Sequence, residues 1–471
     1  MRERAISQDE EAGAGARIVN FVRLAEAANG QPLHERLYQR IRTLIVSGTI
    51  ARGAKLAPSR VLAEALGISR NSVLNALDRL IADGWLEARR GSGVYVAYDG
   101  ARISDAALRP PVRRPQAIPL EAGLPPLDLF PIETWNRLQS RRWRHMSQAG
   151  LQEGESAGWP ALREAIAAHL AAARGFDCSP DQIVVTTSIP AGIDLATRAL
   201  GLAGAHAWVE DPSFNGSKQS LHNCGVQLVP VPVDAEGIDI AVGERMGGDA
   251  RVALVSPVAQ YPTGVPMSKR RRERLLAWAR AGNAWIFEDD YGWNEAGCSA
   301  ARPLAADGHA NVVYFNSFNH TLFPALRIAF VVLPPGLIGR FLAVREGLDG
   351  HSNVPNQMVL ADFIDGGHLD DHLRRSRECL AERRAVLVQA IARHLSPKLM
   401  AVSSRGVGEV ICDLLGHEEE TIVARAAEAG ISLTGMSRLR LIAGPPQLLL
   451  GASFPPDAMR RAVEGLAALL G

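Results

Sequence analysis

Apolar residues in the first part of the chain recur every three or four positions in three short segments. The first begins at Leu33 and ends near Gly48, the second covers residues 59–66 and the third covers residues 70–83. Such spacing predicts three amphipathic helices, and a glycine follows each of the last two where a helix can end. On the third helix we expect this apolar side: Val73, Leu74, Leu77 and Leu80.

Two short runs typical of β-strands follow the third helix. They cover residues 85–88 and 94–96 and flank Arg89-Arg90-Gly91-Ser92-Gly93, which predicts a hairpin. Three helices, a tight turn between the second and third, and a glycine-tipped hairpin describe a winged helix-turn-helix over residues 31–98. Residues at the starts of the last two helices and on the wing are the expected DNA contacts: Arg60, Arg70, Asn71, Ser72, Arg89, Arg90 and Gly93.

The charge of this segment agrees with a DNA-binding role. Over residues 31–98, ten Lys and Arg residues stand against five Asp and Glu residues, a net charge of +5, whereas the whole chain carries +1. A local basic excess attracts phosphates, and the balanced whole-chain composition conceals it. Residues 1–30 contain no apolar leader segment and are expected to form a flexible arm.

The rest of the chain divides into a linker and a long α/β region. Residues 99–118 contain three prolines and four arginines, which predicts an extended linker. From residue 119 to residue 471, apolar strand-like runs alternate with helical segments, which predicts a mainly parallel sheet covered on both faces, ending in a small α+β lobe. The expected helices include 159–173, 193–202 and one long helix from about Gln357 to His394.

Polar residues cluster after several of the predicted strands, where α/β sheets bind ligands. The most informative stretch runs from Tyr314 to Arg327 between two apolar runs, and we expect it to be a loop between buried strands. It contains Ser317 and His320, and ends on a Pro-x-Leu-Arg segment.

Two family resemblances rest on these residues. The runs 56–63 and 67–70 resemble the GntR family of bacterial regulators. With that head in front, the remainder resembles the MocR/GabR family, in which a winged helix is fused to a fold-type I aminotransferase-like domain. The motifs that carry this second resemblance are Glu210-Asp211-Pro212, Gln260-Tyr261-Pro262-Thr263-Gly264, Glu288-Asp289-Asp290-Tyr291, the stretch 314–327, and Gly367-His368-Leu369 through Arg374.

The resemblance implies a pyridoxal 5′-phosphate (PLP) pocket. By position, Phe214 would stack on the cofactor ring, Asp289 would pair with its nitrogen, Tyr291 would meet its hydroxyl and Arg327 would hold its phosphate. The residues alone leave other roles open: Asp289 can cap a turn after a strand, and Phe214 can be ordinary core packing. The other implied pocket residues are Ser188, Ile189, Tyr261, Ser317 and His320.

The chain departs from the family pattern at the reactive atom. His320 occupies the position of the family's lysine, and an imidazole has no primary amine with which to form the imine that anchors PLP. We leave open whether His320 contacts a ligand, pairs with a phosphate without a covalent bond, or only fills space. In the phosphate-binding turn 187–191, Pro190 has no backbone N–H to donate. Of the four lysines, only Lys218, one helical turn beyond Phe214, is a conceivable substitute; the others are Lys55, Lys269 and Lys398.

Other features exclude some classes of function. The five cysteines are scattered, as in reduced cytosolic proteins, and no apolar run is long enough to cross a membrane. His368 and His372 are spaced i, i+4, but no further ligand accompanies them, so no metal site is expected.

The sequence therefore predicts a cytoplasmic bacterial transcriptional regulator. Its winged helix would bind operator double-stranded DNA. Its aminotransferase-like domain would form a homodimer, head-to-tail as the resemblance implies, and would sense a small molecule without catalysis and without covalent PLP. Two alternatives stay open. A PLP-dependent aminotransferase-type enzyme or PLP-responsive regulator requires a pocket lysine, and a ligand-independent DNA-binding dimer is favoured by the blocked phosphate turn.

Overall fold

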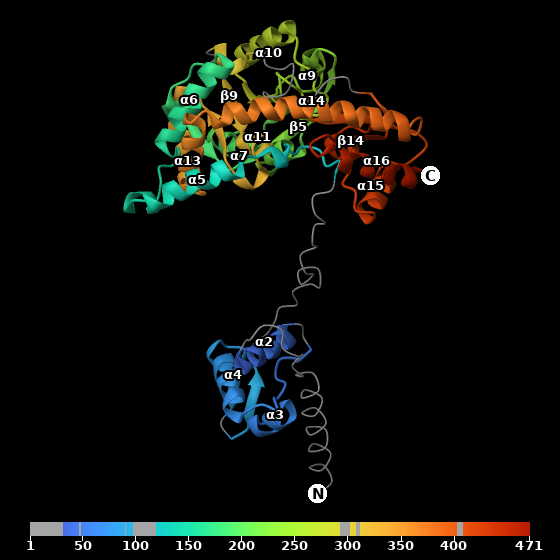
Figure 1. Cartoon of the computed structure of the whole chain (residues 1–471). Helices are drawn as coiled ribbons and strands as arrows, with labels where there is room; N and C mark the ends of the chain where they lie inside the picture. The colour runs from blue at the N-terminus through green and yellow to red at the C-terminus, as the bar shows by residue number, and fades with distance from the viewer. Residues whose placement is uncertain are drawn as a thin grey trace. The chain divides into compact units, whose positions relative to one another are not determined.

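The computed structural model divides the chain into two compact units, residues 1–113 and 114–471, each of which we describe by itself (Figure 1). The arm expected at residues 1–30 and the linker expected at 99–118 lie outside the described residues, so both stay predictions. The structure describes residues 32–46, 49–89, 91–97, 119–292, 302–307, 311–402 and 408–471.

The N-terminal unit contains the three expected helices and the hairpin. The helices are α2 (Leu33–Val46), α3 (Ser59–Leu66) and α4 (Arg70–Ala82). Strands β1 (Leu86–Arg89) and β2 (Gly93–Val96) pair antiparallel. Together these elements form the predicted winged helix-turn-helix.

The core of the N-terminal unit follows the predicted apolar pattern with one exception. The α2 residues Leu37 and Ile41 are fully buried and pack with Val73 and Leu80 of α4. Leu74, which we expected on the same side, is 36% exposed, so that prediction is wrong. A single residue step turns an α-helix by about 100°, so Leu74 points away from the stripe on which Val73, Leu77 and Leu80 lie.

The C-terminal unit is built on an eight-stranded sheet with the order β3-β10-β9-β8-β7-β4-β5-β6. Strands β9, β8, β7, β4 and β5 run parallel, whereas β10 is antiparallel to both of its neighbours and β6 is antiparallel to β5. The mainly parallel sheet is therefore confirmed. The strand bounds are β3 Ile183–Thr186, β4 His206–Asp211, β5 Gln227–Asp234, β6 Gly237–Ile238, β7 Val252–Val255, β8 Trp285–Asp289, β9 Val312–Ser317 and β10 Ala329–Val332.

Both faces of this sheet are covered, which is why its central strands read as continuous apolar runs. Along β3, Ile183 and Val185 belong to one hydrophobic cluster and Val184 to another, because successive side chains of a strand point to opposite faces. The first cluster packs against α5 (Ile132–Arg144), α6 (Pro160–Arg174) and α13 (Val354–Asp365). The other face is covered by α7 (Ile189–Ala199), α8 (Asn215–Asn223) and α12 (Pro335–Glu346). The helices α9 (Ile240–Met246) and α10 (Lys269–Ala281) lie farther along the first face, because Val312 of β9 packs in their cluster and Tyr314, two residues later, packs in the first one.

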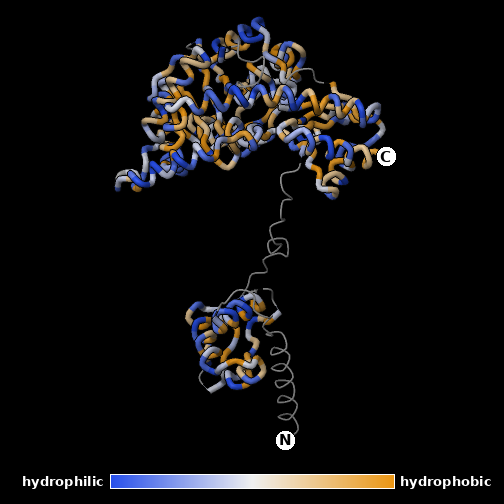
Figure 2. The backbone as a smooth tube through the Cα atoms, viewed as in Figure 1, coloured by the Kyte–Doolittle hydropathy of each residue, from blue (hydrophilic) through white to orange (hydrophobic). Residues whose placement is uncertain are grey.

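A smaller lobe ends the chain, as predicted. Its antiparallel sheet has the order β11-β12-β14-β13 and packs against α15 (Glu419–Glu428) and α16 (Pro456–Leu470). Helix α14 (His368–His394) runs from the side of α13 to this lobe (Figure 1), and blue and orange alternate along it as in an amphipathic helix (Figure 2). The lobe's strands are β11 Leu399–Ala401, β12 Glu409–Leu414, β13 Thr434–Gly435 and β14 Gln447–Gly451.

Three sequence predictions for the C-terminal unit are wrong in detail. The long helix expected from Gln357 is two helices, because the chain breaks between α13 and α14 at Gly367, whose φ of +72° is left-handed. The stretch expected to be a loop from Tyr314 begins as strand, since residues 314–317 complete β9 before the short helix α11 (Phe318–Thr321). The helix expected at 193–202 is α7, which begins four residues earlier, at Ile189.

Short 3-10 helices complete the described elements. None of the helices in the described ranges is long and apolar enough to cross a membrane. The 3-10 helices are Leu127–Leu129, Gln148–Leu151, Pro180–Gln182, Leu304–Asp307, Pro324–Leu326 and Met436–Leu439.

Candidate functional site

The recognition helix α4 presents its first turn to solvent. Ser69 caps it, because its side-chain oxygen accepts a hydrogen bond from the backbone N–H of Ser72 at 3.1 Å. Arg70 and Asn71 are exposed, Ser72 is half-buried, and Arg70 Nε lies 3.4 Å from Ser59 Oγ at the start of α3. Arg60 of α3 is exposed as well. The predicted helix residues therefore lie at the two helix starts, with their polar groups accessible.

The wing is more internally bonded than the sequence suggested. Arg89 donates to Glu87 Oε1 at 2.6 Å, and its guanidinium lies 4.4 Å from the centroid of the Tyr95 ring. Lys55 Nζ lies 5.9 Å from the same ring, and Lys55 forms an isolated β-bridge with Tyr95. The sequence did not indicate that Lys55 lies beside the wing, because its pairing with Tyr95 joins residues far apart in the chain. Gly93 is exposed, and Arg90 lies outside the described residues.

In the C-terminal unit one cavity of about 520 Å³ collects every residue predicted for the cofactor pocket. Most of them stand at or just beyond the carboxyl ends of parallel strands, where a ligand site is expected in such a sheet. The predicted residues that line the cavity are Ser188, Ile189, Phe214, Tyr261, Asp289, Tyr291, Ser317, His320 and Arg327.

Sequence reasoning missed one wall of the cavity, the segment Leu120–Leu124, which we call the entry segment. Residues 121–124 line the cavity, and His320 Nδ1 donates to Gly123 O at 3.3 Å. Gly451 N donates to Leu120 O at 2.9 Å, and Gly123 N donates to Glu409 Oε1 at 3.2 Å. These bonds fix the entry segment to the C-terminal lobe. No local motif marks it, since its partners lie far along the chain.

Aromatic rings form a continuous side of the cavity. Phe214 and Tyr261 meet edge to face with centroids 6.0 Å apart, Tyr261 and Tyr291 at 5.4 Å, and Tyr291 and His320 at 5.3 Å. Phe214 is 46% exposed, which excludes ordinary core packing as its role. A half-exposed ring on a cavity wall offers a face on which a flat ligand can stack.

Asp289 is the buried acid of the cavity. Its Oδ1 accepts from Tyr291 N at 3.2 Å and its Oδ2 from Ser217 Oγ at 3.5 Å. Burial, together with the neighbouring charge of Asp290, raises the pKa of Asp289 to about 7, against the opposing effects of the Tyr291 N–H and of His320. The predicted turn-capping bond is present, and the carboxyl group also faces the cavity. It can therefore accept a proton shared with a basic ligand atom at neutral pH.

A second buried carboxyl lies on β4, which β7 separates from β8 in the sheet. Glu210 is 2% exposed, and its Oε2 accepts from Ser256 N at 3.2 Å and from Gln260 Nε2 at 3.3 Å. Burial raises the pKa of Glu210 to about 8, and the charge of Asp289 adds to this effect. The Glu210 and Gln260 motifs found in the sequence thus contact each other beneath the cavity.

Two serines and one arginine line another side of the cavity. Ser188 caps α7 by accepting from Ala191 N at 3.2 Å, and Pro190 stands in the first turn without an N–H. Ser317 caps α11 by accepting from Asn319 N at 3.0 Å. Each serine still has a hydroxyl hydrogen to donate. In the part of the chain that the structure describes, the exposed Arg327 guanidinium makes no hydrogen bond or ion pair.

All four lysines are described, and none lines the cavity. Lys218, the conceivable substitute, is 1% exposed and donates to Leu439 O at 2.6 Å. Lys269 is exposed beside Glu273, and Lys398 donates to the carbonyls of Leu470 and Gly471. Lys55 belongs to the N-terminal unit.

The wall of the cavity next to the C-terminal lobe is apolar. Behind Tyr261 and Tyr291 lie four buried residues: Ile411, Met436, Leu439 and Leu449. Leu449 lies on β14 (Gln447–Gly451), a strand that contains no arginine. Within the described residues, Arg327 is the only arginine that lines the cavity.

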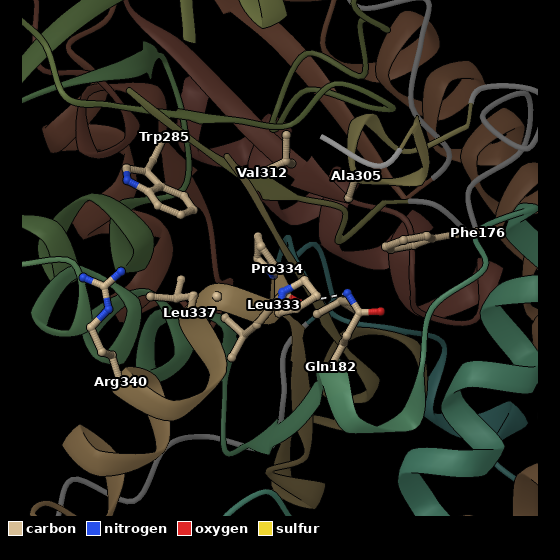
Figure 3. Close-up of a pocket in the computed structure, with 12 residues that line it drawn as sticks. Phe176, Gln182, Trp285, Ala305, Val312, Leu333, Pro334, Leu337 and Arg340 are labelled. Atoms are coloured by element: carbon tan, nitrogen blue, oxygen red, sulfur yellow. Dashed lines mark hydrogen bonds between the residues drawn. The ribbon is translucent and has the colours of Figure 1, made fainter. Parts of the chain in front are cut away.

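A second cavity of about 340 Å³ lies at the opposite ends of the strands (Figure 3). It is lined mainly by apolar side chains, including Phe176, Trp285 and Leu337, and Gln182 Nε2 donates to Leu333 O at 3.0 Å. None of the predicted site residues contributes to it. We therefore take the larger cavity as the candidate ligand site.

The two histidines spaced i, i+4 on α14 serve the packing of the helix. His372 is fully buried, and its Nε2 donates to Thr321 O at 3.0 Å. The described residues contain no group of three or more His, Cys, Asp or Glu side chains placed to hold a metal ion.

Comparison with known proteins bears on both units. Residues 33–96 match the family of bacterial regulatory proteins of the gntR type, and residues 115–426 match aminotransferase class I and II. The probable rhizopine catabolism regulatory protein MocR of Rhizobium meliloti is 33% identical over 92% of this chain and 93% of its own length. The chain is a MocR-type regulator of the GntR family.

Other relatives and solved structures agree. The regulator TauR of Rhodobacter capsulatus is 30% identical over 78% of the chain and 81% of its own length. An archaeal alanine:glyoxylate aminotransferase covers 75% of the chain and 90% of its own, with 22% identity and a TM-score of 0.69. That likeness shows the fold alone. The MocR-type chain is thus a DNA-binding transcriptional regulator with an aminotransferase fold-type I body.

The cavity residues fit PLP in part. The set of groups on its walls matches the ring and the phosphate: a carboxyl group at Asp289, a phenol at Tyr291, a stacking face at Phe214 and a guanidinium at Arg327. It does not match the carbonyl carbon, which in aminotransferases is held by an amine, because no lysine lines the cavity.

Proposed function

We propose that this MocR-type regulator senses a small ligand in the 520 Å³ cavity without a covalent link to it, and that its body is not an enzyme. The proposal depends on the observation that none of the four lysines lines the cavity. Transamination on PLP requires an amine that exchanges with the substrate, and the cavity presents His320 in its place. The body would recognise its ligand by hydrogen bonds, charge and stacking.

A relative points to the class of signal. The HTH-type pyridoxine biosynthesis transcriptional regulator PdxR of Corynebacterium glutamicum is 26% identical over 85% of this chain and 87% of its own length. Its name links one member of the group to vitamin B6. Together with the groups that line the cavity, this favours a ligand of the vitamin B6 type over an unrelated metabolite.

We also propose that the body forms a homodimer, head-to-tail, which places two heads on paired half-sites of the operator. Phosphate contacts would provide most of the affinity, and Arg70, Asn71 and Ser72 would select the sequence. The ligand would act by favouring one of two arrangements of the heads, which requires that it bind those arrangements with different affinity.

Absorbance and DNA binding test the two halves of this proposal separately. With added PLP, the purified chain should show no visible band of a lysine adduct and, after borohydride, no PLP mass on a cavity peptide. A borohydride-stable adduct on Lys218, with turnover of an amino acid, would refute the non-enzymatic body. In gel shifts, Arg70→Ala should weaken operator binding by more than about tenfold and leave the oligomeric state unchanged.

A matched control variant tests whether the loss of any positive charge would weaken operator binding. Arg137→Ala removes the same charge from an exposed position on α5 of the body and should leave operator binding unchanged. Equal affinity of Arg70→Ala and the unaltered chain would remove α4 from the DNA interface. Ultracentrifugation of the same samples tests the dimer.

A ligand-independent dimer is the second candidate function. It is favoured by Pro190, which removes one N–H from the start of α7, and by Ser188, which occupies the N–H of Ala191. A thermal shift with PLP distinguishes the two, because a ligand that binds only the folded chain raises its unfolding temperature.

A further inference from the structure

We infer that Lys55 binds a backbone phosphate of DNA, at a site on the outer face of the wing that the proposed function does not include. Such a site holds any DNA sequence equally and takes no part in selecting the operator. The inference rests on the proposed function in one respect only, namely that the head must bind DNA on the side where α3 and α4 begin.

Lys55 belongs to the sheet that forms the wing. Leu56 N donates to Val94 O of β2 at 2.9 Å, and Lys55 pairs with Tyr95 in an isolated β-bridge. The residues that follow this pair, Leu56 and Val96, are buried in the core of the head. Because successive side chains of a strand point to opposite faces of a sheet, the side chains of the bridged pair point away from that core.

The Lys55 side chain reaches the tip of the wing. A Cβ added to Gly93 would lie 3.2 Å from Lys55 Cε, so the glycine leaves the space that the lysine side chain occupies. Along the chain, Lys55 stands shortly before Ser59, where α3 begins, and Ser59 Oγ lies 3.4 Å from Arg70 Nε at the start of α4. Lys55 therefore links the two groups of predicted DNA contacts, the wing tip and the helix starts.

The positive charge of Lys55 is not neutralised within the described part of the head. Lys55 is exposed, and its ammonium makes no hydrogen bond or ion pair there. The ammonium lies 5.9 Å from the centroid of the Tyr95 ring, near the outer limit of a cation–π contact. A second cation, Arg89, lies 4.4 Å from the same centroid, but it donates to Glu87 Oε1 at 2.6 Å. Glu87 thus balances Arg89, and Lys55 is left to attract an anion from outside the head.

A phosphate fits this site better than the edge of a base. A lysine ammonium is a compact charge with three N–H donors, so it can bind a phosphate oxygen from many directions. Reading a base requires donors held in a fixed orientation, as in the bidentate contacts of arginine and asparagine. The Lys55 ammonium contacts only the face of the Tyr95 ring, which is itself held by a hydrogen bond of 2.6 Å between the hydroxyls of Tyr95 and Ser92. The structure therefore favours a contact that does not depend on sequence.

Fluorescence anisotropy with the full chain tests the site on two labelled duplexes, one that the chain selects from a random pool and one of arbitrary sequence. The affinity for each is measured at several KCl concentrations, because the slope of log K against log [KCl] reports how many phosphates a protein neutralises. Lys55→Gln should make this slope shallower by about 0.9 for each head on the DNA, and should weaken binding to both duplexes by the same factor, about 3- to 10-fold. Lys55→Arg retains the charge, so it should keep the slope and bind within about twofold of the unaltered chain.

Two further variants separate the phosphate site from other causes of weaker binding. Lys269→Gln removes the same charge from a side chain of the body that is 92% exposed, and it should leave the slope unchanged. Arg70→Ala removes a predicted base contact, so it should weaken binding to the selected duplex more than binding to the arbitrary one.

Three results would each overturn the inference. They are an unchanged slope for Lys55→Gln, a loss of affinity confined to the selected duplex, and equal weakening by Lys55→Gln and Lys55→Arg, which would indicate packing rather than charge. If the slope stays unchanged for Lys55→Gln while Arg70→Ala still weakens binding to the selected duplex, the Lys55 site fails and the proposed role of α4 stands.

Discussion

Glu210→Gln tests whether the carboxyl groups beneath the cavity are removed from water. Glu210 is 2% exposed, and burial raises its pKa from 4.5 to about 8. An acid whose pKa is higher in the folded state holds its proton more tightly there, so it favours folding while protonated. That contribution is fully present below pH 4.5 and is lost as the pH rises toward 8.

The magnitude follows from the distance between the two pKa values. Glutamine has nearly the shape of the protonated acid and cannot ionise. The stability of the variant should therefore not decrease with pH in the way that ionisation of Glu210 makes the unaltered chain less stable. The difference in the free energy of unfolding between variant and unaltered chain should therefore grow by about 1.4 kcal/mol per pH unit in this range. Between pH values of about 5.5 and about 7.5, it should rise by roughly 2 to 3 kcal/mol in favour of the variant.

Urea unfolding at these two pH values, followed by tryptophan fluorescence, measures the difference. The signal reports on the body, because Trp85 is the one tryptophan of the eight that lies in the N-terminal unit. As a control, Glu133→Gln removes the same charge from an exposed position of α5 and should have little effect at either pH. A difference for Glu210→Gln that stays constant between the two pH values would refute the assignment of a protonated Glu210 in the folded chain.

Two further substitutions test the local structure of each unit. Ser69→Ala removes the cap of α4 and should lower the stability of the N-terminal unit by about 1 kcal/mol, whereas Ser69→Gly should cost only a few tenths, both measured by thermal unfolding. Equal effects of the two would contradict the capping role. Gly192→Ala places a Cβ 2.7 Å from Val331 Cγ2 and 3.1 Å from Phe315 Cδ1, and should destabilise the body by about 1–2 kcal/mol in urea, despite the higher helix propensity of alanine. A more stable variant would show that Val331 and Phe315 move to accept the added Cβ, which would contradict this prediction.

The cavity could be predicted from the sequence because its residues belong to motifs that end strands. Asp289 follows the apolar run of β8, and Ser317 ends β9, so the parallel topology alone brings them to one edge of the sheet. The family resemblance then assigned nine positions to the pocket, and the structure places all nine in one cavity. Their roles in binding stay predictions.

Several structural features could not be predicted from the sequence, because they depend on backbone conformation, on the angular position of a side chain, or on contacts between distant segments. The break at Gly367 was missed because the apolar pattern continues across it, and only the left-handed backbone at that residue separates α13 from α14. Leu74 was assigned to the core because apolar character was counted without its angular position. Lys55 and the entry segment acquire their places through partners 40 or more residues away, such as Tyr95 and Gly451, and no spacing rule contains such pairs.

The position of the entry segment determines which part of the chain a ligand in the cavity would contact. The segment lies at the start of the described part of the C-terminal unit, and its residues 121–124 line the candidate cavity. The carbonyl of Leu120 accepts a hydrogen bond from Gly451 N, and that of Gly123 accepts one from His320 Nδ1. A ligand in the cavity would therefore contact a segment that is hydrogen-bonded to the C-terminal lobe. Under the proposed function, ligand binding would therefore bear directly on residues that follow the predicted linker in the sequence.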